Sequence, residues 1–150
     1  MIRWIRPYIF IIATVVFVLD RVSKYVALNS LAAGESIRVI PNILHVTLVR
    51  NNGAAFGLFK SGAAFFIIFS VLAIALIILF IARSQALSLY TATSLALISG
   101  GAAGNLVDRL KFGYVIDFLD FRIWPVFNIA DTAICVGVGL LAITLFTKRS

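Results

Sequence analysis

The sequence predicts an all-α membrane protein, a bundle of four transmembrane helices with a small β-element outside the bilayer. Of its 150 residues, 62% are hydrophobic and only 13% are charged. That leaves too little polar surface to cover a water-soluble globule of this size. Four apolar stretches approach or exceed the roughly 20 residues that cross about 30 Å of hydrocarbon. We therefore expect residues 1–150 to form a single integral-membrane domain.

The first span is expected at about 7–28. It follows Arg3 and Arg6, as the apolar segment of a cleaved signal peptide would. Three charged residues between positions 20 and 24 interrupt its apolar run, and the next small-residue stretch lies beyond them without a cysteine to lipidate. We therefore interpret this segment as a retained span.

A β-element outside the bilayer is expected at about 29–60, because residues 36–49 are rich in β-branched side chains. The remaining spans are expected at about 63–82, 87–107 and 126–147. The segment 108–125 holds three of the six acidic residues together with aromatic ones, which indicates an interfacial loop or a short surface helix.

The charge balance excludes several classes of function. Thirteen basic residues against six acidic ones give a net charge of +7, but no basic run is long enough to follow a nucleic acid, so we expect no nucleic-acid partner. Anionic lipid headgroups are the expected counter-charge. One histidine and one cysteine cannot build a zinc or iron–sulfur site, so we expect no metal and no cofactor.

The distribution of basic residues predicts the orientation. Four spans place both termini on one side of the membrane. The short segments on that side carry five basic residues and no acidic one. The positive-inside rule therefore predicts cytoplasmic termini, with the opposite, periplasmic face carrying all six acids.

Polar side chains gather at the ends of the predicted spans. Because successive spans alternate in direction, these residues are all expected at one face of the membrane, where each is a functional candidate or a structural pair. They are Asp20, Lys24, Asn51, Asn52, Asn105, Asp108, Arg109, Asp117, Asn128 and Asp131.

Several of these positions also have a purely structural interpretation. Asp20 and Lys24 are spaced as a helical ion pair, and for Asp108 and Arg109 we favour a structural pair or a headgroup contact. Asn128 has the character of a helix cap, although a helix beginning near Pro125 would place the next acid deeper in the apolar segment.

The glycines and the two rare side chains point to structure as well. Gly100 and Gly104, four residues apart, favour close helix packing, and Gly53 fits a turn that needs a positive φ. His45 is interpreted as a residue of the β-element and Cys135 as inert packing.

Two carboxylates brought together in a low-dielectric pocket cannot both ionise, and a shared proton gives one acid and one base. Asp117, flanked by apolar residues, and Asp131 are candidates for such a pair, which needs no metal, cysteine or histidine.

The sequence resembles the lipoprotein signal peptidases, or signal peptidase II, of bacterial inner membranes over nearly its whole length. Five stretches in the family's order carry the resemblance: Asp20-Arg21-Val22-Ser23-Lys24, Asn51-Asn52-Gly53-Ala54-Ala55-Phe56, Gly100 to Arg109, Val115-Ile116-Asp117-Phe118, and Phe127-Asn128-Ile129-Ala130-Asp131.

This resemblance implies that Asp117 and Asp131 are catalytic, and it implies a periplasmic β-cradle with a loop or helix over the site. The segment 118–125 is short beside some members of the family. The remaining motif residues are implied to bind substrate or shape the site: Asp20, Lys24, Asn51, Gly53, Asn105, Asp108, Arg109 and Asn128.

The implied reaction is hydrolysis of the bond before the diacylglyceryl-modified cysteine of a prolipoprotein. The expected partners are these substrates and membrane lipids, and the enzyme is expected to be a monomer. Two other classes stay open on the residues alone: a small proton-coupled transporter or channel, and a non-catalytic scaffold. Polar groups at one face argue against a conduction path.

Overall fold

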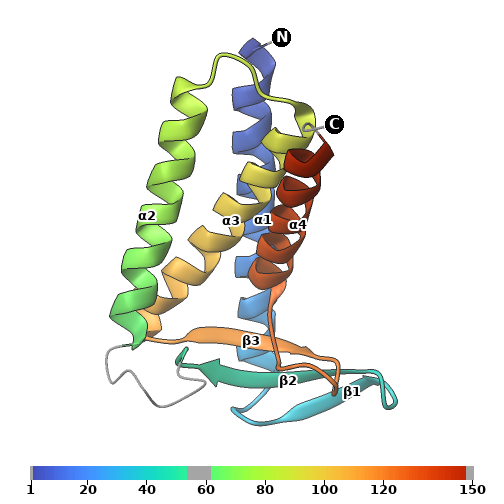
Figure 1. Cartoon of the computed structure of the whole chain (residues 1–150). Coiled ribbons are helices and arrows are strands. Elements are labelled where there is room, and N and C mark those ends of the chain that lie inside the picture. Colours follow the sequence, from blue (N-terminus) through green and yellow to red (C-terminus); the bar gives the residue numbers. More distant parts are fainter. Residues whose placement is uncertain (1, 54–61, 148–150) are drawn as a thin grey trace.

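The computed structural model describes residues 2–53 and 62–147, in which four helices stand beside a small sheet (Figure 1). The helices are α1 (Ile2–Ser30), α2 (Gly62–Arg83), α3 (Leu89–Phe112) and α4 (Ile129–Thr147). Both chain ends lie at the end of the bundle opposite the sheet. Residues 54–60 of the expected β-element, including the motif residues Ala54 to Phe56, lie outside the described residues.

Helix α3 is the centre of the bundle and packs against the other three helices. Its glycines permit this approach. A Cβ at Gly100 would lie 2.6 Å from the backbone oxygen of Ala13 in α1, and one at Gly101 would lie 2.5 Å from that of Ala130 in α4. The close packing predicted for this stretch is thereby confirmed.

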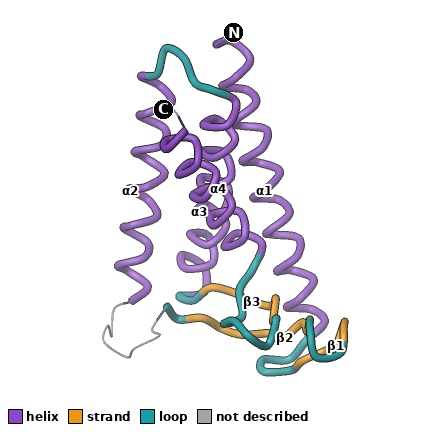
Figure 2. Tube along the Cα trace, turned by 45° about the vertical axis from the view of Figure 1, so that its right-hand side comes forward, coloured by secondary structure: helices purple, strands orange, loops and turns teal. Residues whose placement is uncertain are grey.

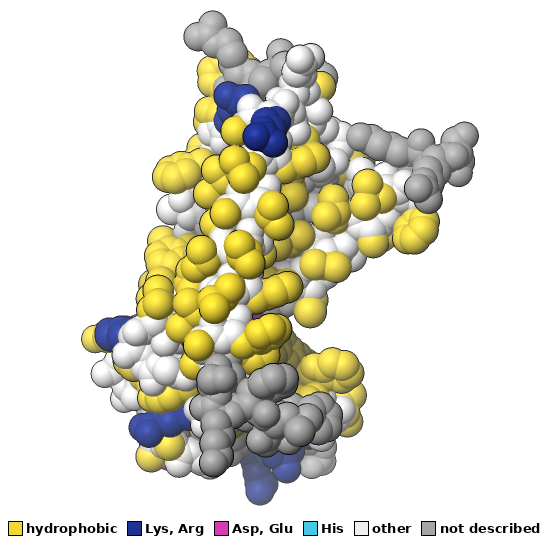
Figure 3. Space-filling model, turned by 60° about the vertical axis from the view of Figure 1, so that its left-hand side comes forward, with side chains coloured by type: hydrophobic (Ala, Val, Ile, Leu, Met, Phe, Trp, Pro, Cys, Tyr) yellow, Lys and Arg dark blue, Asp and Glu magenta, His cyan; other side chains and the backbone are white. Residues whose placement is uncertain are grey.

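Two helices are long and apolar enough to cross a membrane by length and composition alone, Ala63–Arg83 and Ile129–Thr147. Helix α1 carries charged residues, and α3 is rich in glycine, serine and threonine, so this criterion selects neither of them among the described residues. Large apolar side chains nevertheless stand outward along α1, α2 and α4. Figure 3 shows this apolar surface over the middle of the helices, with basic side chains toward both ends.

The sheet contains three antiparallel strands in the order β1 (Ser36–Ile40), β2 (Leu44–Asn51) and β3 (Val115–Asp120) (Figure 2). The expectation of a loop or surface helix was wrong for 115–120, which form β3. Its residues are β-branched, aromatic or buried acidic ones, and the strand pairs with β2, from Asn51 opposite Val115 to His45 opposite Asp120. This pairing satisfies backbone groups that a lone apolar segment would leave open.

The sheet is fixed to the end of α1 by an apolar cluster. Ala27 of α1 and Leu31, the residue after it ends, pack with Leu48 of β2 and with Ile116 and Phe118 of β3, and all five are buried. This contact sets the position of β3, and with it that of Asp117, relative to the helices.

Two helix boundaries differ from the predicted ones. Helix α3 continues to Phe112, where Gly113 ends it in the left-handed region at φ 79° and donates its N–H to Arg109. Helix α4 begins at Ile129, not near 126, because the backbone of Phe127 is bonded to Leu119 of β3. A residue held in a strand bridge cannot also begin a helix.

Candidate active site

A buried ionic cluster lies where α1 and α3 meet. It consists of Asp20, Arg21, Lys24 and Asp108. The Lys24 ammonium contacts Asp20 at 2.9 Å and Asp108 at 2.7 Å, while Arg21 contacts Asp108 at 2.6 Å. The side chains of Asp20 and Asp108 are fully buried, and that of Lys24 is 1% exposed. Two carboxylates and two cations therefore neutralise each other inside the protein.

The ionic cluster also fixes the chain around it. Asp20 accepts a hydrogen bond from the backbone N–H of Ala130 in α4 at 3.1 Å, and Asp108 accepts one from Ile116 in β3 at 3.2 Å. A Cβ at Gly104 would collide with the Asp20 carboxylate, so glycine is required there. The cluster thus joins α1, α3, α4 and β3.

Two buried asparagines form an amide bridge from this cluster to Asp117 and Asp131. The Asn105 oxygen accepts from Lys24 at 2.9 Å, so its NH2 group faces Asp131 and donates at 2.7 Å. The Asn128 oxygen accepts from the backbone N–H of Asp131 at 2.8 Å, so its NH2 group faces Asp117 and donates at 2.6 Å. Each asparagine is thereby oriented by one contact and presents its donors to a carboxylate.

Asp117 is 1% exposed and lies in β3, outside the helices. Its second oxygen accepts from the Asn51 side chain at 2.8 Å, and Asn51 itself is held by the backbone N–H of Gly53. Gly53 has φ 72°, as predicted for this turn. Burial is the main cause that raises the pKa of Asp117 to about 6, and the nearby charge of Asp131 adds to this rise against the two amide hydrogen bonds.

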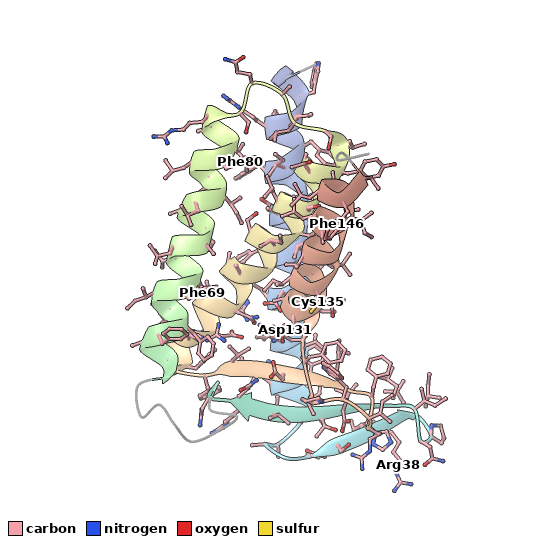
Figure 4. The ribbon with its side chains drawn as sticks, viewed as in Figure 1. Arg38, Phe69, Phe80, Asp131, Cys135 and Phe146 are labelled. Carbon is pink, nitrogen blue, oxygen red and sulfur yellow. The ribbon has the colours of Figure 1, made fainter. Side chains whose placement is uncertain are left out.

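Asp131 lies in the first turn of α4, with Asn128 as the helix cap. A helix beginning near Pro125 would have placed it deeper in the apolar segment, but α4 begins at Ile129. The partial positive charge of the helix N-terminus lies beside this carboxylate. Figure 4 shows Asp131 at the end of α4 that faces the sheet.

Among the described residues Arg109 forms no ion pair with Asp108, and a structural pair of the kind that we favoured exists for Asp108 but not for Arg109. Its guanidinium lies 4.8 Å from the ring centre of Phe66 in α2 and interacts electrostatically with Asp131 and Asp117. Asp108 is instead taken by Arg21 and Lys24. The helical spacing predicted correctly the end of α3 at which Arg109 lies. It did not predict which carboxylates its guanidinium would face.

Sequence reasoning missed two further residues. Arg21 reaches Asp108 although it was treated only as an interruption of the first span. Phe66 lies under Arg109 and also occupies the space that a side chain at Gly53 would need. The position of Arg21 directly after Asp20 was the one feature of the sequence that could have indicated its role. No sequence pattern distinguishes Phe66 from the other phenylalanines of α2.

The two aspartates open onto different pockets. Asp117 lines a polar pocket of about 520 Å³ together with Asn51, Asn52, Gly53 and Pro125. Asp131 lines an apolar pocket of about 340 Å³ with, among others, Trp124, Phe127, Cys135 and Val136. In Figure 3 the surface is hollowed between the helices and the sheet.

The chain's one histidine and one cysteine were both predicted to be structural residues. His45 belongs to β2, as predicted, and its ring contacts Ser36 across the sheet. Cys135 is exposed on α4, so the expectation that it packs inside the protein was wrong. Among the described residues, no group of three or more His, Cys, Asp or Glu side chains could hold a metal ion.

Comparisons with known proteins agree with this architecture. A family model for signal peptidase (SPase) II matches residues 12–147. The lipoprotein signal peptidase of Halothermothrix orenii is 40% identical over 141 residues, which cover 94% of this chain and 97% of that protein. The lipoprotein signal peptidase of Moorella thermoacetica is 47% identical over 135 residues, covering 87% of each chain.

Solved structures also match. One bacterial membrane enzyme, determined at 1.9 Å by the in meso method, superposes with a TM-score of 0.87 at 35% identity and covers 93% of this chain and 92% of its own. A second, at 2.3 Å, gives a TM-score of 0.88 at 34% identity, with 96% and 90% covered.

Proposed function

The chain belongs to the signal peptidase II family, and from that premise we propose that Asp117 and Asp131, the aspartate pair, are its catalytic residues. The activity is that of a lipoprotein signal peptidase, an aspartic peptidase that cleaves signal peptides from prolipoproteins. The observation that carries the proposal is the shared environment of the pair. Both carboxylates are held by amide donors and each opens onto a pocket.

The environments assign different tasks to the two carboxylates. Asp117 is buried and its raised pKa makes it the member that holds the shared proton. Asp131 stands at a helix N-terminus, where the partial positive charge of the helix lies beside its carboxylate. We infer that Asp117 is the general acid and Asp131 the general base of the first step.

The proton transfers follow from this assignment. Asp131 takes a proton from a water whose oxygen bonds to the scissile carbonyl carbon, while Asp117 gives its proton to the carbonyl oxygen. The tetrahedral intermediate then collapses. The C–N bond breaks, the proton on Asp131 passes to the leaving nitrogen, and a hydroxyl proton of the intermediate returns to Asp117. Both carboxyls end in their starting states.

The two pockets support a lipid-modified substrate. The polar pocket offers amide groups of Asn51 and Asn52 to a peptide backbone. The apolar pocket beside Asp131 is continuous with exposed residues of α4 such as Val136, which is 56% exposed. We propose that the bond before the diacylglyceryl cysteine lies between these pockets, with its acyl chains on the α4 side.

All four helices are proposed to cross the membrane, with cytoplasmic termini and a periplasmic active site. Support for α1 comes from its outward apolar residues, such as Phe10 and Leu19, while Asp20 and Lys24 are turned inward and fully buried. Lipid would therefore meet no charge from these two residues. The acid-free basic segments at the terminal end favour the cytoplasm for that side.

A conduction path receives no support from the bundle. The hydroxyl groups of Ser94 in α3 and Thr144 in α4 donate hydrogen bonds to backbone oxygens of their own helix, those of Tyr90 and Leu140. A proton relay would need these groups to contact one another or an acid.

The proposal is tested by cleavage of a purified diacylated prolipoprotein in detergent. Asp117→Asn and Asp131→Asn should each lower turnover by at least about 10³-fold, because an amide cannot transfer the catalytic proton. The double variant should be no less active than either single one, since the pair acts as a unit.

Asp120→Asn is the matched control. Asp120 lies three residues from Asp117 on the same strand, but it is bonded to Thr47 and Arg122 and lies away from the amide bridge. It should keep near-normal turnover. Substantial cleavage by a folded Asp117→Asn enzyme would overturn the assignment.

A further inference from the structure

An apolar groove lies between α1 and α2 in the half of the bundle that is remote from the active site. Ile9, Phe10 and Ala13 line it from α1, and isoleucines of α2 such as Ile77 and Ile78 line it from the other side. Ser99 of α3 contributes to its lining, and its volume is about 380 Å³. Nothing in the proposed peptidase mechanism uses this groove.

The groove has the length of one membrane leaflet. Its lining runs from Arg6 to Ala13 on α1 and from Ile74 to Ala82 on α2. At 1.5 Å per residue, these segments are about 10 to 12 Å long. Half of a hydrocarbon core is about 15 Å thick. The groove therefore extends from the end of the bundle that carries the termini toward the middle of the membrane.

A basic rim stands at the outer end of the groove. Arg6 lines the groove and donates a hydrogen bond to the backbone oxygen of Ala82 at 3.1 Å. Arg83, exposed, is the last residue of α2. All six Asp and Glu residues lie toward the sheet end of the molecule, so among the described residues no acidic side chain lies beside this rim.

We propose that this groove binds an acyl chain of an anionic phospholipid, whose phosphate is held by the rim of Arg6 and Arg83. The leaflet is the cytoplasmic one if the proposed topology holds, but the binding itself does not depend on the peptidase assignment. Arginine suits this role because its guanidinium donates several hydrogen bonds to phosphate oxygens and remains charged.

Charge and size favour a lipid over the signal peptide of a substrate. A signal peptide carries a positively charged segment before its apolar core, and Arg6 and Arg83 would repel that segment. A helix of about 10 Å diameter and 12 Å length fills roughly 900 Å³, which is more than twice the volume of the groove. An extended acyl chain is much thinner than a helix.

Tryptophan fluorescence provides the test. The chain has two tryptophans, and the Trp124→Phe variant leaves Trp4, which is 81% exposed and lies two residues before Arg6 on α1. This variant is placed in phosphatidylcholine vesicles with a minor fraction of phosphatidylglycerol brominated on an acyl chain. We expect stronger quenching of Trp4 than with brominated phosphatidylcholine at the same fraction.

Two pairs of variants in that background locate the binding. Arg6→Gln should weaken the preference for phosphatidylglycerol about five-fold, the effect of one basic residue beside anionic lipid. Arg38→Gln on β1, at the other end of the molecule (Figure 4), should not. Ile77→Phe, which fills the groove, should reduce quenching, whereas Leu76→Phe on the outward face, 65% exposed, should not.

The outcomes separate the two proposals. Equal quenching by both brominated lipids, or a preference that survives Arg6→Gln, would overturn lipid binding, and displacement of the lipid by a synthetic signal peptide would assign the groove to substrate. Prolipoprotein cleavage is measured in the same vesicles on Arg6→Gln alone, in a protein that keeps Trp124, and should persist. Lipid preference without any cleavage would instead count against the peptidase assignment alone.

Discussion

The ionic cluster and the aspartate pair are neighbouring sets of carboxylates whose nearest partners differ in charge. Asp20, Asp108 and Asp117 are buried, and Asp131 is half-buried. Asp20 and Asp108 share the cations Lys24 and Arg21 at 2.6 to 3.7 Å. Within the described residues, Asp117 and Asp131 form no ion pair and are held by neutral amides. A contacting cation holds a carboxylate in an ion pair, whereas an amide holds it in position without placing a full charge beside it.

The amide bridge keeps the two sets apart and still connects them. Lys24 touches Asn105 but neither member of the aspartate pair, and Asn105 passes the contact on to Asp131. The positive charge therefore orients the Asp131 carboxylate through a neutral group. Aspartates therefore stabilise the fold in one set and are proposed to react in the other. The difference between the sets is whether the nearest donor is a cation or an amide.

The largest effect on folding is expected for Lys24→Met. It would leave two buried carboxylates with only Arg21 and should destabilise the protein by about 3 to 5 kcal/mol. The free energy of unfolding in detergent measures this loss. Asp108→Asn added to Lys24→Met should restore part of the stability, because it removes one uncompensated charge.

Arg21→Gln is the milder companion of this variant. The Arg21 side chain is 23% exposed, so water can replace part of its contact with Asp108. Its loss should be smaller than that of Lys24→Met. A Lys24→Met protein as stable as the wild type would show that the ionic cluster is not what holds the bundle together.

The pH dependence of stability should have opposite signs for Asp117 and Asp120. The folded-state pKa of Asp117 is raised from 3.8 to about 6, so the folded protein binds this proton more tightly than the unfolded chain. Its contribution is fully present below pH 3.8 and is lost as the pH rises to 6, by up to about 3 kcal/mol. The stability of Asp117→Asn relative to wild type should therefore improve over that range.

For Asp120, a hydrogen bond from the Arg122 backbone is the main cause of a lowered pKa. Its stabilisation is present above the ordinary pKa of 3.8 and is lost as the pH falls through the lowered value. The free energy of unfolding of Asp120→Asn should thus fall relative to that of the wild type as the pH rises. Thermal unfolding of both variants between pH 3 and 7 measures how their stability relative to wild type changes with pH. Equal changes in the two variants would contradict the predicted difference in sign.

A smaller loss is expected for Gly104→Ala, which pushes a methyl group against Asp20. Displacement of that carboxylate should cost about 2 kcal/mol. Gly139→Ala in α4 is the control, because its Cβ would meet nothing within 4 Å, and it should be neutral or slightly stabilising. Equal unfolding temperatures for the two variants would remove the steric argument for Gly104.

No effect is expected from chelators. The aspartate pair activates water through a shared proton, so EDTA should leave prolipoprotein cleavage unchanged. Activity that falls with EDTA and returns on addition of a divalent metal would make these carboxylates metal ligands. They would then contact a cation, as the carboxylates of the ionic cluster do.

Local features of this protein were predictable from its sequence. The four apolar segments became four helices, β2 lies within the predicted β-element, and Gly53 and Asn128 have the turn and cap geometry expected of them. Hydropathy, turn preference and capping depend on residues within a few positions of one another. The sequence therefore carries these signals directly.

The predictions that were wrong share a different cause. Strand β3 exists because β2 offers it an edge, and α4 starts late because Phe127 is held by Leu119. Cys135 faces outward on a helix that is apolar on every side, so no periodic pattern could orient it. Each outcome depends on a partner that is distant in the sequence.

The sequence by itself determined the membrane character, the helices and the gathering of polar residues at one end of the bundle, because these follow from local sums of hydropathy. Only the tertiary structure decided which carboxylate meets a cation and which meets an amide. That choice depends on the rotation of α1, α3 and α4 about their axes, which is set by close approach at Gly100, Gly101 and Gly104. Such a contact joins residues about 90 positions apart, as in Gly100 and Ala13, and no local pattern can encode it.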